Sequence, residues 1–156
     1  MLVFRIEREK YLPSVLEGIG AARSKGSRWN SFQTHMVYTA ESRALAMLEV
    51  AVHLDLSQEL PSDRCFVSIE IPEEVEILRL SREDLPPLWD AKPPSRESQS
   101  IGDAFIRSKA AAVLRVPSSI VPMEYNYLIN PHHPDAAKIK VIQKERLVID
   151  ERLSLK

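Results

Sequence analysis

The chain has 156 residues, of which 44% are hydrophobic and 28% are charged, as in an ordinary soluble globular protein. This length fits a single domain spanning residues 1–156, and the composition excludes intrinsic disorder. The formal net charge of −1 excludes a bulk electrostatic attraction to nucleic acid or to anionic lipid, so we expect neither direct nucleic-acid binding nor membrane binding.

The usual marks of export are missing from the sequence. Cys65 is the single cysteine, so an internal disulfide is excluded. No run approaches the roughly 20 apolar residues that span a bilayer. The first eight residues carry charges where a signal peptide needs an apolar stretch. We therefore expect a cytoplasmic protein.

The first quarter of the chain predicts two strands separated by a helix and a basic loop. Residues 2–6 form a short apolar run typical of a strand, and residues 11–19 predict a short helix that ends at a glycine. Residues 21–33 are polar and basic without periodicity, which predicts a loop. Residues 36–39 predict the next strand.

The clearest helix follows over residues 44–54, with Thr39 or Ser42 as its cap. On a wheel of 3.6 residues per turn, five side chains share one apolar arc that we expect to face the core. They are Ala44, Leu45, Leu48, Ala51 and Val52. Glu49 lies at the edge of this arc, so we expect it neither in the core nor on the outermost face of the helix.

Beyond this helix, several short strands alternate with proline-rich connections. Residues 65–71 alternate between apolar and polar and predict a strand. The further elements are a proline-rich loop over 86–94, a helix over 101–112, and strands over 111–116, 138–142 and 146–149. Non-consecutive strands with few helices favour an α+β fold around a mixed or antiparallel sheet with flanking helices.

Two segments resemble nucleotide-binding or metal-binding motifs, but neither matches such a motif fully. Residues 18–23 resemble a dinucleotide-binding fingerprint, but Arg23 stands where the third glycine should be and no strand leads into the segment. The adjacent histidines 132 and 133 lie between prolines, and neighbouring residues seldom converge on one metal. We therefore expect no metal site.

Five polar residues are candidates for a functional site, although each has an ordinary structural explanation. Arg28, next to a tryptophan in a basic loop, can grip a pyrophosphate with its planar fork of donors, or it can simply be exposed. Tyr38 suits a strand, and Glu49 suits a solvated helix edge. Ser118 follows a proline as turn residues do, and Asn126 can satisfy backbone groups in a loop.

Taken in order, four segments resemble the RES-domain proteins, which are toxins of bacterial toxin–antitoxin pairs named for an Arg, a Glu and a Ser. The segments are Lys25-Gly-Ser-Arg-Trp-Asn30, Val37-Tyr-Thr-Ala40, Ala44-Leu-Ala-Met-Leu-Glu49 and Val116-Pro-Ser-Ser119. The three residues of the name would here be Arg28, Glu49 and Ser118. The resemblance runs from about residue 4 to residue 153. The family tends to have a second glycine before the Arg, where this chain has Ser27.

The resemblance implies a fold similar to the ADP-ribosyltransferases, with NAD as substrate and no prosthetic cofactor. The implied reaction cleaves the nicotinamide–ribose bond and passes ADP-ribose to phosphate, as an NAD phosphorylase does, or to water, as an NAD glycohydrolase does. Because nicotinamide leaves as a neutral molecule, no acid has to protonate it, and one carboxylate suffices where most glycosidases need two.

On this resemblance each candidate residue takes a role. Glu49 would hold the ribose hydroxyls and stabilise the oxocarbenium-like charge that develops at the sugar. Arg28 would clamp the pyrophosphate, and Tyr38 would pack against the nicotinamide or its ribose. Ser118 would bond a phosphate or the incoming acceptor, and Asn126 would shape the site.

Two alternatives stay open. One is an ADP-ribosyltransferase that modifies a cellular protein, which differs only in the acceptor. The other is a non-enzymatic interaction module that keeps the fold. The resemblance also implies a partner, a helix-turn-helix (Xre-like) antitoxin, and it leaves a homodimer open.

Overall fold

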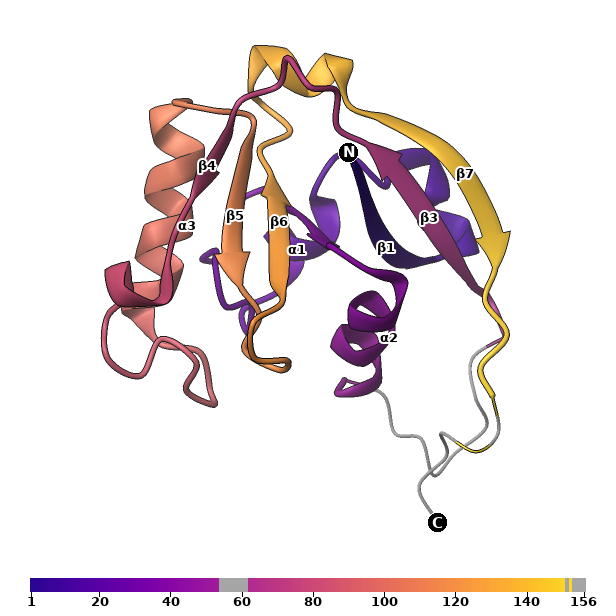
Figure 1. Cartoon of the computed structure of the whole chain (residues 1–156), viewed down its shortest axis with the longest axis horizontal. Coiled ribbons are helices and arrows are strands. Elements are labelled where there is room, and N and C mark those ends of the chain that lie inside the picture. The colour runs from indigo at the N-terminus through magenta and orange to yellow at the C-terminus, as the bar shows by residue number, and fades with distance from the viewer. Residues whose placement is uncertain (54–61, 151, 153–156) are drawn as a thin grey trace.

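A computed structural model describes residues 1–53, 62–150 and 152, and the strands within them form one seven-stranded sheet (Figure 1). The strands are β1 (Leu2–Arg8), β2 (Val37–Ala40), β3 (Arg64–Glu70), β4 (Ile77–Arg79), β5 (Val113–Pro117), β6 (Tyr125–Ile129) and β7 (Lys140–Arg146). Their spatial order is β4-β5-β6-β2-β1-β3-β7. All neighbours are antiparallel except β4 and β5. This mixed sheet confirms the predicted α+β fold.

The described residues also form short helices, and a serine caps the N-terminus of the two longer ones. The helices are α1 (Ile19–Arg23), α2 (Arg43–Ala51) and α3 (Arg96–Ser108), with 3-10 turns η1 (Glu9–Ser14), η2 (Arg82–Asp84) and η3 (Pro134–Lys138). The Ser42 hydroxyl accepts a hydrogen bond from the backbone N–H of Leu45 at 3.0 Å, which confirms Ser42 rather than Thr39 as the cap of α2. Ser95 caps α3 in the same way.

The sheet is nearly divided at its centre. β1 pairs with β3 along its whole length, and β2 pairs with β6 along its whole length. Between β1 and β2, by contrast, the single pair is Phe4 with Ala40. Beyond this pair the two strands separate, and α2 packs against both of them (Figure 1).

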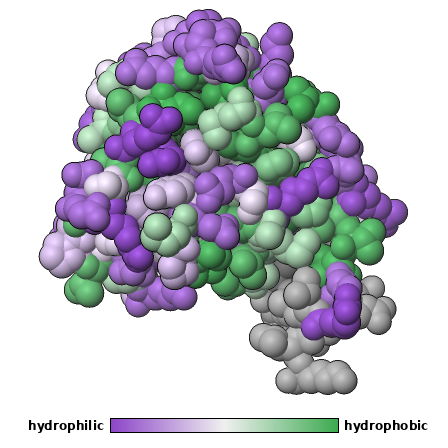
Figure 2. Space-filling model, in the orientation of Figure 1, coloured by the Kyte–Doolittle hydropathy of each residue, from purple (hydrophilic) through white to green (hydrophobic). Residues whose placement is uncertain are grey.

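Three clusters of buried side chains hold the sheet and its helices together. The first centres on β1, β3 and β6 and includes Val67 and Ile69. The second joins α3 to β5 and β6 through Phe105 and Leu128, and the third joins α2 to β1 through Leu45. Hydrophilic residues are interspersed with hydrophobic ones over the face shown in Figure 2. No helix among the described residues has the length and apolarity that crossing a membrane requires.

Two predicted helices have different bounds in the structure. The helix predicted over residues 11–19 is wrong, because η1 ends at Ser14 and α1 begins only at Ile19. Pro13 lacks the N–H that an α-helix needs at that position, so the chain forms a tighter turn. The helix predicted over 101–112 corresponds to α3, which begins earlier, at Arg96, and ends earlier, at Ser108. Lys109 ends it in the left-handed conformation (φ 49°).

The buried face of α2 also differs from the predicted apolar arc. Leu45 is buried as expected, but Leu48 is 44% exposed and Val52 is 52% exposed. Ala46 is buried instead, on the same side as Glu49 and Val50. The helix is turned toward this side because it covers the gap between β1 and β2. Leu54, the predicted last residue of the helix, lies outside the described residues.

The remaining differences concern strands. The short β4 was not predicted, nor was β6, which contains Asn126, a residue considered above as one that can satisfy backbone groups in a loop. β7 is one strand rather than two, because it pairs with β3 continuously except for an irregularity at Ser68. The strands predicted over 2–6, 36–39 and 65–71 are confirmed within a few residues.

Gly18 permits the turn that leads into α1. Its φ of +68° is a conformation that L side chains rarely adopt, and an added Cβ would lie 2.5 Å from the backbone nitrogen of Met36. We expect Gly18→Ala to lower the free energy of unfolding by about 1–3 kcal/mol in urea titrations. Gly26→Ala is the matched control, because nothing lies within 4 Å of its added Cβ. Equal stability of the two variants would contradict this role of Gly18.

Candidate active site

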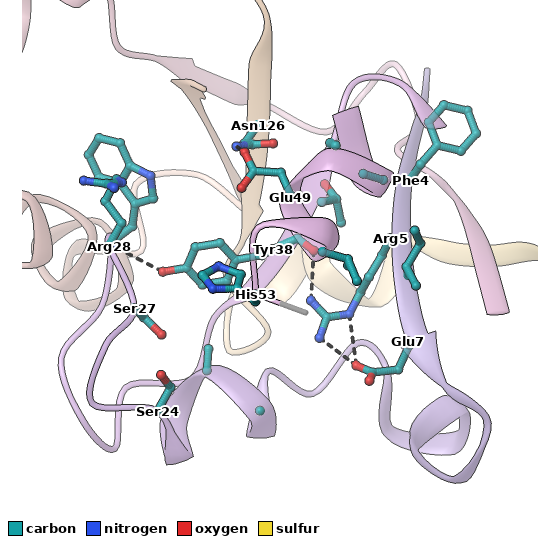
Figure 3. A pocket seen from close by; sticks show the side chains of 18 of the residues that line it. Phe4, Arg5, Glu7, Ser24, Ser27, Arg28, Tyr38, Glu49, His53 and Asn126 are labelled. Atoms are coloured by element: carbon teal, nitrogen blue, oxygen red, sulfur yellow. Dashed lines mark hydrogen bonds and ion pairs between the residues drawn. The ribbon is translucent and has the colours of Figure 1, made fainter. Parts of the chain in front are cut away.

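A cavity of about 480 Å³ opens where β1 and β2 separate (Figure 3). Its walls come from β1, from α1 and the loop after it, from β2, from α2 and from β6. Four of the five predicted site residues line it: Arg28, Tyr38, Glu49 and Asn126. Segments that lie far apart in the sequence thus meet at one opening in the sheet.

The Glu49 carboxylate is held by two donors from the β5–β6 region. The Asn126 side-chain amide donates to Glu49 Oε1 at 2.6 Å, and the Ser118 hydroxyl donates to the same oxygen at 3.3 Å. In Figure 3 Glu49 and Asn126 point toward one another at the edge of the cavity. One bond from β6 and one from the turn that follows β5 fix the direction of the carboxylate, which an isolated helix edge would leave free to rotate.

Ser118 does not line the cavity, whereas the next residue, Ser119, does. The Ser118 side chain is buried, and its hydroxyl oxygen accepts from the backbone N–H groups of Ile120 and Val121, both at 3.1 Å. Its proton is then directed at Glu49. Ser118 therefore bonds to the Glu49 carboxylate but does not line the cavity.

Tyr38 presents its ring to the cavity while its hydroxyl group is bonded within the protein. The hydroxyl donates to Asn30 Oδ1 at 2.7 Å and accepts from the Trp29 backbone N–H at 3.0 Å. Burial raises the pKa of Tyr38 well above its usual value, so the phenol stays protonated at neutral pH. The ring is thus a fixed, uncharged wall.

Asn30 is the centre of the loop that carries Arg28. It is fully buried, and its side-chain amide donates to the backbone carbonyls of Ala21, Ser31 and Thr34. Its carbonyl oxygen accepts the Tyr38 proton. Sequence analysis did not single out Asn30 as functional, because a lone Asn in a polar loop carries no signal of burial.

Arg28 lies in the cavity wall with part of its guanidinium already bonded. Its Nη1 donates to the carbonyls of Trp89 at 2.7 Å and Ala91 at 3.1 Å. Burial lowers the pKa of Arg28, although nearby Asp90 and Glu49 oppose this effect, and arginine remains charged at neutral pH. Its Nε and Nη2 have no partner among the described residues, so one two-pronged edge can still bind an anion.

Arg28 and its neighbour Trp29 occupy different places in the structure. Trp29 is buried and stacks on Trp89 with ring centroids 5.8 Å apart, so it anchors the loop. Arg28 lines the cavity. The proline-rich loop that carries Trp89 therefore contacts the Arg28 loop twice, through the indole stack and through its carbonyls.

Helix α3 supports the same loop along one edge. The Gln99 side chain donates to the Ser27 carbonyl at 2.9 Å, and the Asp103 carboxylate accepts from the Ser31 N–H at 3.0 Å. Between them Gly102 touches the Trp29 backbone so closely that an added Cβ would lie 1.7 Å from its carbonyl oxygen. The absence of a side chain at Gly102 lets the Arg28 loop sit directly on the helix.

The cavity also contains charged residues that sequence analysis missed. Arg5 and Glu7 line it from β1, together with His53 beyond the end of α2 (Figure 3). Arg64, at the start of β3, also lines it. A strand at the start of the chain gives no sign that it borders a distant loop, so Arg5 could not be identified from its neighbours. No three His, Cys, Asp or Glu side chains are grouped to hold a metal ion in the part of the chain that the structure describes.

Comparisons with known proteins agree with the motif order in the sequence. A family model described as RES domain matches residues 2–150. The Prs ADP-ribosylating toxin of Sphingobium sp. (strain YBL2) is 46% identical over 142 residues, which cover 88% of this chain and 86% of that protein. Toxin Res of Photorhabdus laumondii subsp. laumondii is 38% identical over 155 residues, covering 98% of this chain and 97% of that one.

A solved structure has a similar fold. It is the crystal structure of the M. tuberculosis MbcT–MbcA toxin–antitoxin complex, with a TM-score of 0.75 and 17% sequence identity. The similarity covers 94% of this chain and 83% of that chain.

Gly102→Ala tests whether α3 positions the Arg28 loop. Alanine would favour an isolated helix by about 1 kcal/mol over glycine. Here we expect instead a loss of about 1–3 kcal/mol in unfolding free energy, because the methyl group would overlap the Trp29 carbonyl. Near-ultraviolet circular dichroism should report a changed Trp29–Trp89 stack. Ser100→Ala, at an exposed position of the same helix, should change neither measurement. A stabilised Gly102→Ala protein with an unchanged spectrum would refute the close contact.

Proposed function

The chain belongs to the RES-domain family, and we propose that it is the toxin of a toxin–antitoxin pair that cleaves NAD in the cavity between β1 and β2. Relatives of nearly the same length carry the name toxin, and one is named for ADP-ribosylation, a reaction that uses NAD as ADP-ribose donor. The polar groups of the cavity suit such a substrate.

The observation that carries the proposal is a Glu49 carboxylate fixed by two donors in the same cavity as an arginine with an available edge. When the nicotinamide–ribose bond breaks, positive charge develops at the ribose. A carboxylate already held in place stabilises that charge without having to reorganise. We assign this role to Glu49, which would also hold the ribose hydroxyls.

Arg28 and Tyr38 are proposed to bind the rest of the substrate. The Nε–Nη2 edge of Arg28 would take the pyrophosphate in a two-pronged contact, while Nη1 stays on the carbonyls of the proline-rich loop. The Tyr38 ring would pack against the nicotinamide or its ribose. Asn126 and Ser118 would act through Glu49. For Ser118 this replaces the direct phosphate contact that the resemblance implied, because its proton is directed at the carboxylate.

The acceptor of ADP-ribose has three candidates, which are phosphate, water and a protein, and water as acceptor would make the protein an NAD glycohydrolase. Phosphate, which would make the protein an NAD phosphorylase, is the acceptor that the family resemblance implies. The name of the 46% identical Sphingobium relative favours a protein acceptor instead. All three reactions share the cleavage step, and none requires a change in the roles of Glu49, Arg28 and Tyr38.

We further propose that a helix-turn-helix (Xre-like) antitoxin restrains the enzyme. The similar fold was solved in a toxin–antitoxin complex, which supports a protein partner. An enzyme that consumes a central cofactor needs such restraint in the cell that makes it.

Incubation of the purified protein with NAD tests the proposed reaction. We expect free nicotinamide in every case. A rate that depends on added phosphate, with ADP-ribose 1″-phosphate as product, identifies the phosphorylase. Free ADP-ribose, released at a rate that does not depend on phosphate, identifies the glycohydrolase. Label transferred from NAD to lysate protein identifies the transferase. If neither nicotinamide nor label appears with folded protein, the protein is not an NAD-cleaving enzyme and the interaction module is favoured.

Glu49→Gln tests the carboxylate. Glutamine keeps the size and can still bond to Asn126 after an amide rotation, but it removes the charge. We expect nicotinamide release to fall about 10²–10³-fold while NAD affinity changes little, because the charge acts mainly in the transition state. Glu73→Gln, at an exposed position outside the cavity, should leave the rate unchanged. Near-native turnover by a folded Glu49→Gln protein would remove Glu49 from the mechanism.

A further inference from the structure

We propose that Arg5 is a positioning residue that keeps the cavity open by holding the backbone of Tyr38 away from β1. This inference deepens the proposed function and rests on it for its kinetic consequence, but the structural part stands without NAD.

The pairing of β1 with β2 would continue to Tyr38 if nothing intervened. In an antiparallel ladder the residue numbers of opposed pairs have a constant sum, so the pair Phe4–Ala40 would place Ile6 opposite Tyr38. That pair is not formed. The Arg5 guanidinium instead donates from Nη1 to the Tyr38 carbonyl at 2.9 Å. A long side chain thus bonds to β2 where the neighbouring strand would otherwise approach.

Glu7 fixes the guanidinium in this orientation. Residues 5 and 7 are two apart on one strand, so their side chains emerge on the same face. Arg5 donates to Glu7 Oε2 from Nη2 at 2.7 Å and from Nε at 3.2 Å (Figure 3). The two side chains are only 20% and 15% exposed, so loss of either partner leaves a largely buried charge without its counterion. The pair therefore acts as one unit.

Through its bond to Tyr38, the Arg5–Glu7 pair is linked to two parts of the proposed substrate site, the Tyr38 ring and the Arg28 loop. The Tyr38 ring forms a wall of the cavity, and its hydroxyl is bonded to Asn30 and to the Trp29 backbone, next to Arg28. A shift of the β2 backbone toward β1 would therefore narrow the cavity and displace the Arg28 loop together with Tyr38. A displacement of about 1 Å at such a site can cost about 10²-fold in rate.

Amide hydrogen exchange of β2 is the first test, because it needs no substrate. We expect Arg5→Gln and Glu7→Gln each to speed exchange across residues 37–40 about tenfold or more, with exchange in β3 unchanged. Arg8→Gln is the matched control. It breaks an exposed pair on the same strand, Arg8 Nε to Asp63 Oδ2 at 2.6 Å, outside the cavity, and should leave β2 exchange as it is. Unchanged β2 exchange in folded Arg5→Gln protein overturns the proposal.

Steady-state kinetics with NAD is the second test, and it separates positioning from loss of folded protein. If part of the protein is misfolded, the apparent kcat falls and KM stays the same. If Arg28 and Tyr38 are displaced, KM for NAD should rise, and we expect a rise of about tenfold in Arg5→Gln. Arg5→Lys keeps one donor for the Tyr38 carbonyl, so we expect a smaller rise. The double variant Arg5→Gln/Glu7→Gln should be no worse than Arg5→Gln, because the two residues act as one unit.

Two outcomes distinguish this inference from its alternatives. A raised KM in Arg5→Gln with unchanged β2 exchange would mean that Arg5 contacts the substrate directly, and the positioning role would be wrong. If the unmodified protein does not cleave NAD, the proposed function fails while the exchange result still decides what Arg5 does to β2.

Discussion

β1 and β2 share one backbone pair, Phe4 with Ala40, and then separate, and every feature of the candidate site depends on that separation. Paired strands lie about 5 Å apart and leave no room for a ligand between them. Once the strands diverge, the exposed backbone groups need other partners, and the Arg5 guanidinium supplies one to Tyr38. Helix α2 covers the same gap, which explains why it turns Ala46 and Glu49 inward and leaves Leu48 exposed.

One wall of the cavity is the loop that carries Arg28, and the contacts beneath this loop are numerous and buried. Asn30 has all of its side-chain hydrogen-bonding groups engaged, and Trp29 is held between the Trp89 stack and α3. A buried polar network that is fully satisfied is rigid, because breaking one bond leaves an unsolvated group. Arg28 is thus presented on a loop that behaves like part of the core. Preorganisation of this kind is what an electrostatic mechanism requires.

The residues that specify the fold differ from those that form the cavity. A chain with 17% identity keeps the fold at a TM-score of 0.75, because alternating apolar positions specify a sheet and many residues satisfy that pattern. The motif segments that carried the family resemblance are instead those that converge on the cavity. Ser118 belongs to one of these segments but has another role than the sequence suggested. The family resemblance implied a contact with the ligand, whereas the hydrogen bonds of Ser118 direct its hydroxyl group to Glu49.

The sequence by itself determined the elements with strong local signals. Alternation in residues 65–71 specified β3, and Thr39 and Ser42 marked the start of α2 within a few residues. The ordered motifs predicted that Arg28, Tyr38, Glu49 and Asn126 lie together, and all four line one cavity. Only the tertiary structure decided which face of α2 is buried and that Asn126 lies in a strand, because both depend on partners distant in the chain. The same holds for Arg5, whose bond to Tyr38 spans 33 residues. No local pattern encodes where two strands stop pairing, since that point is set by side chains packing from outside the pair.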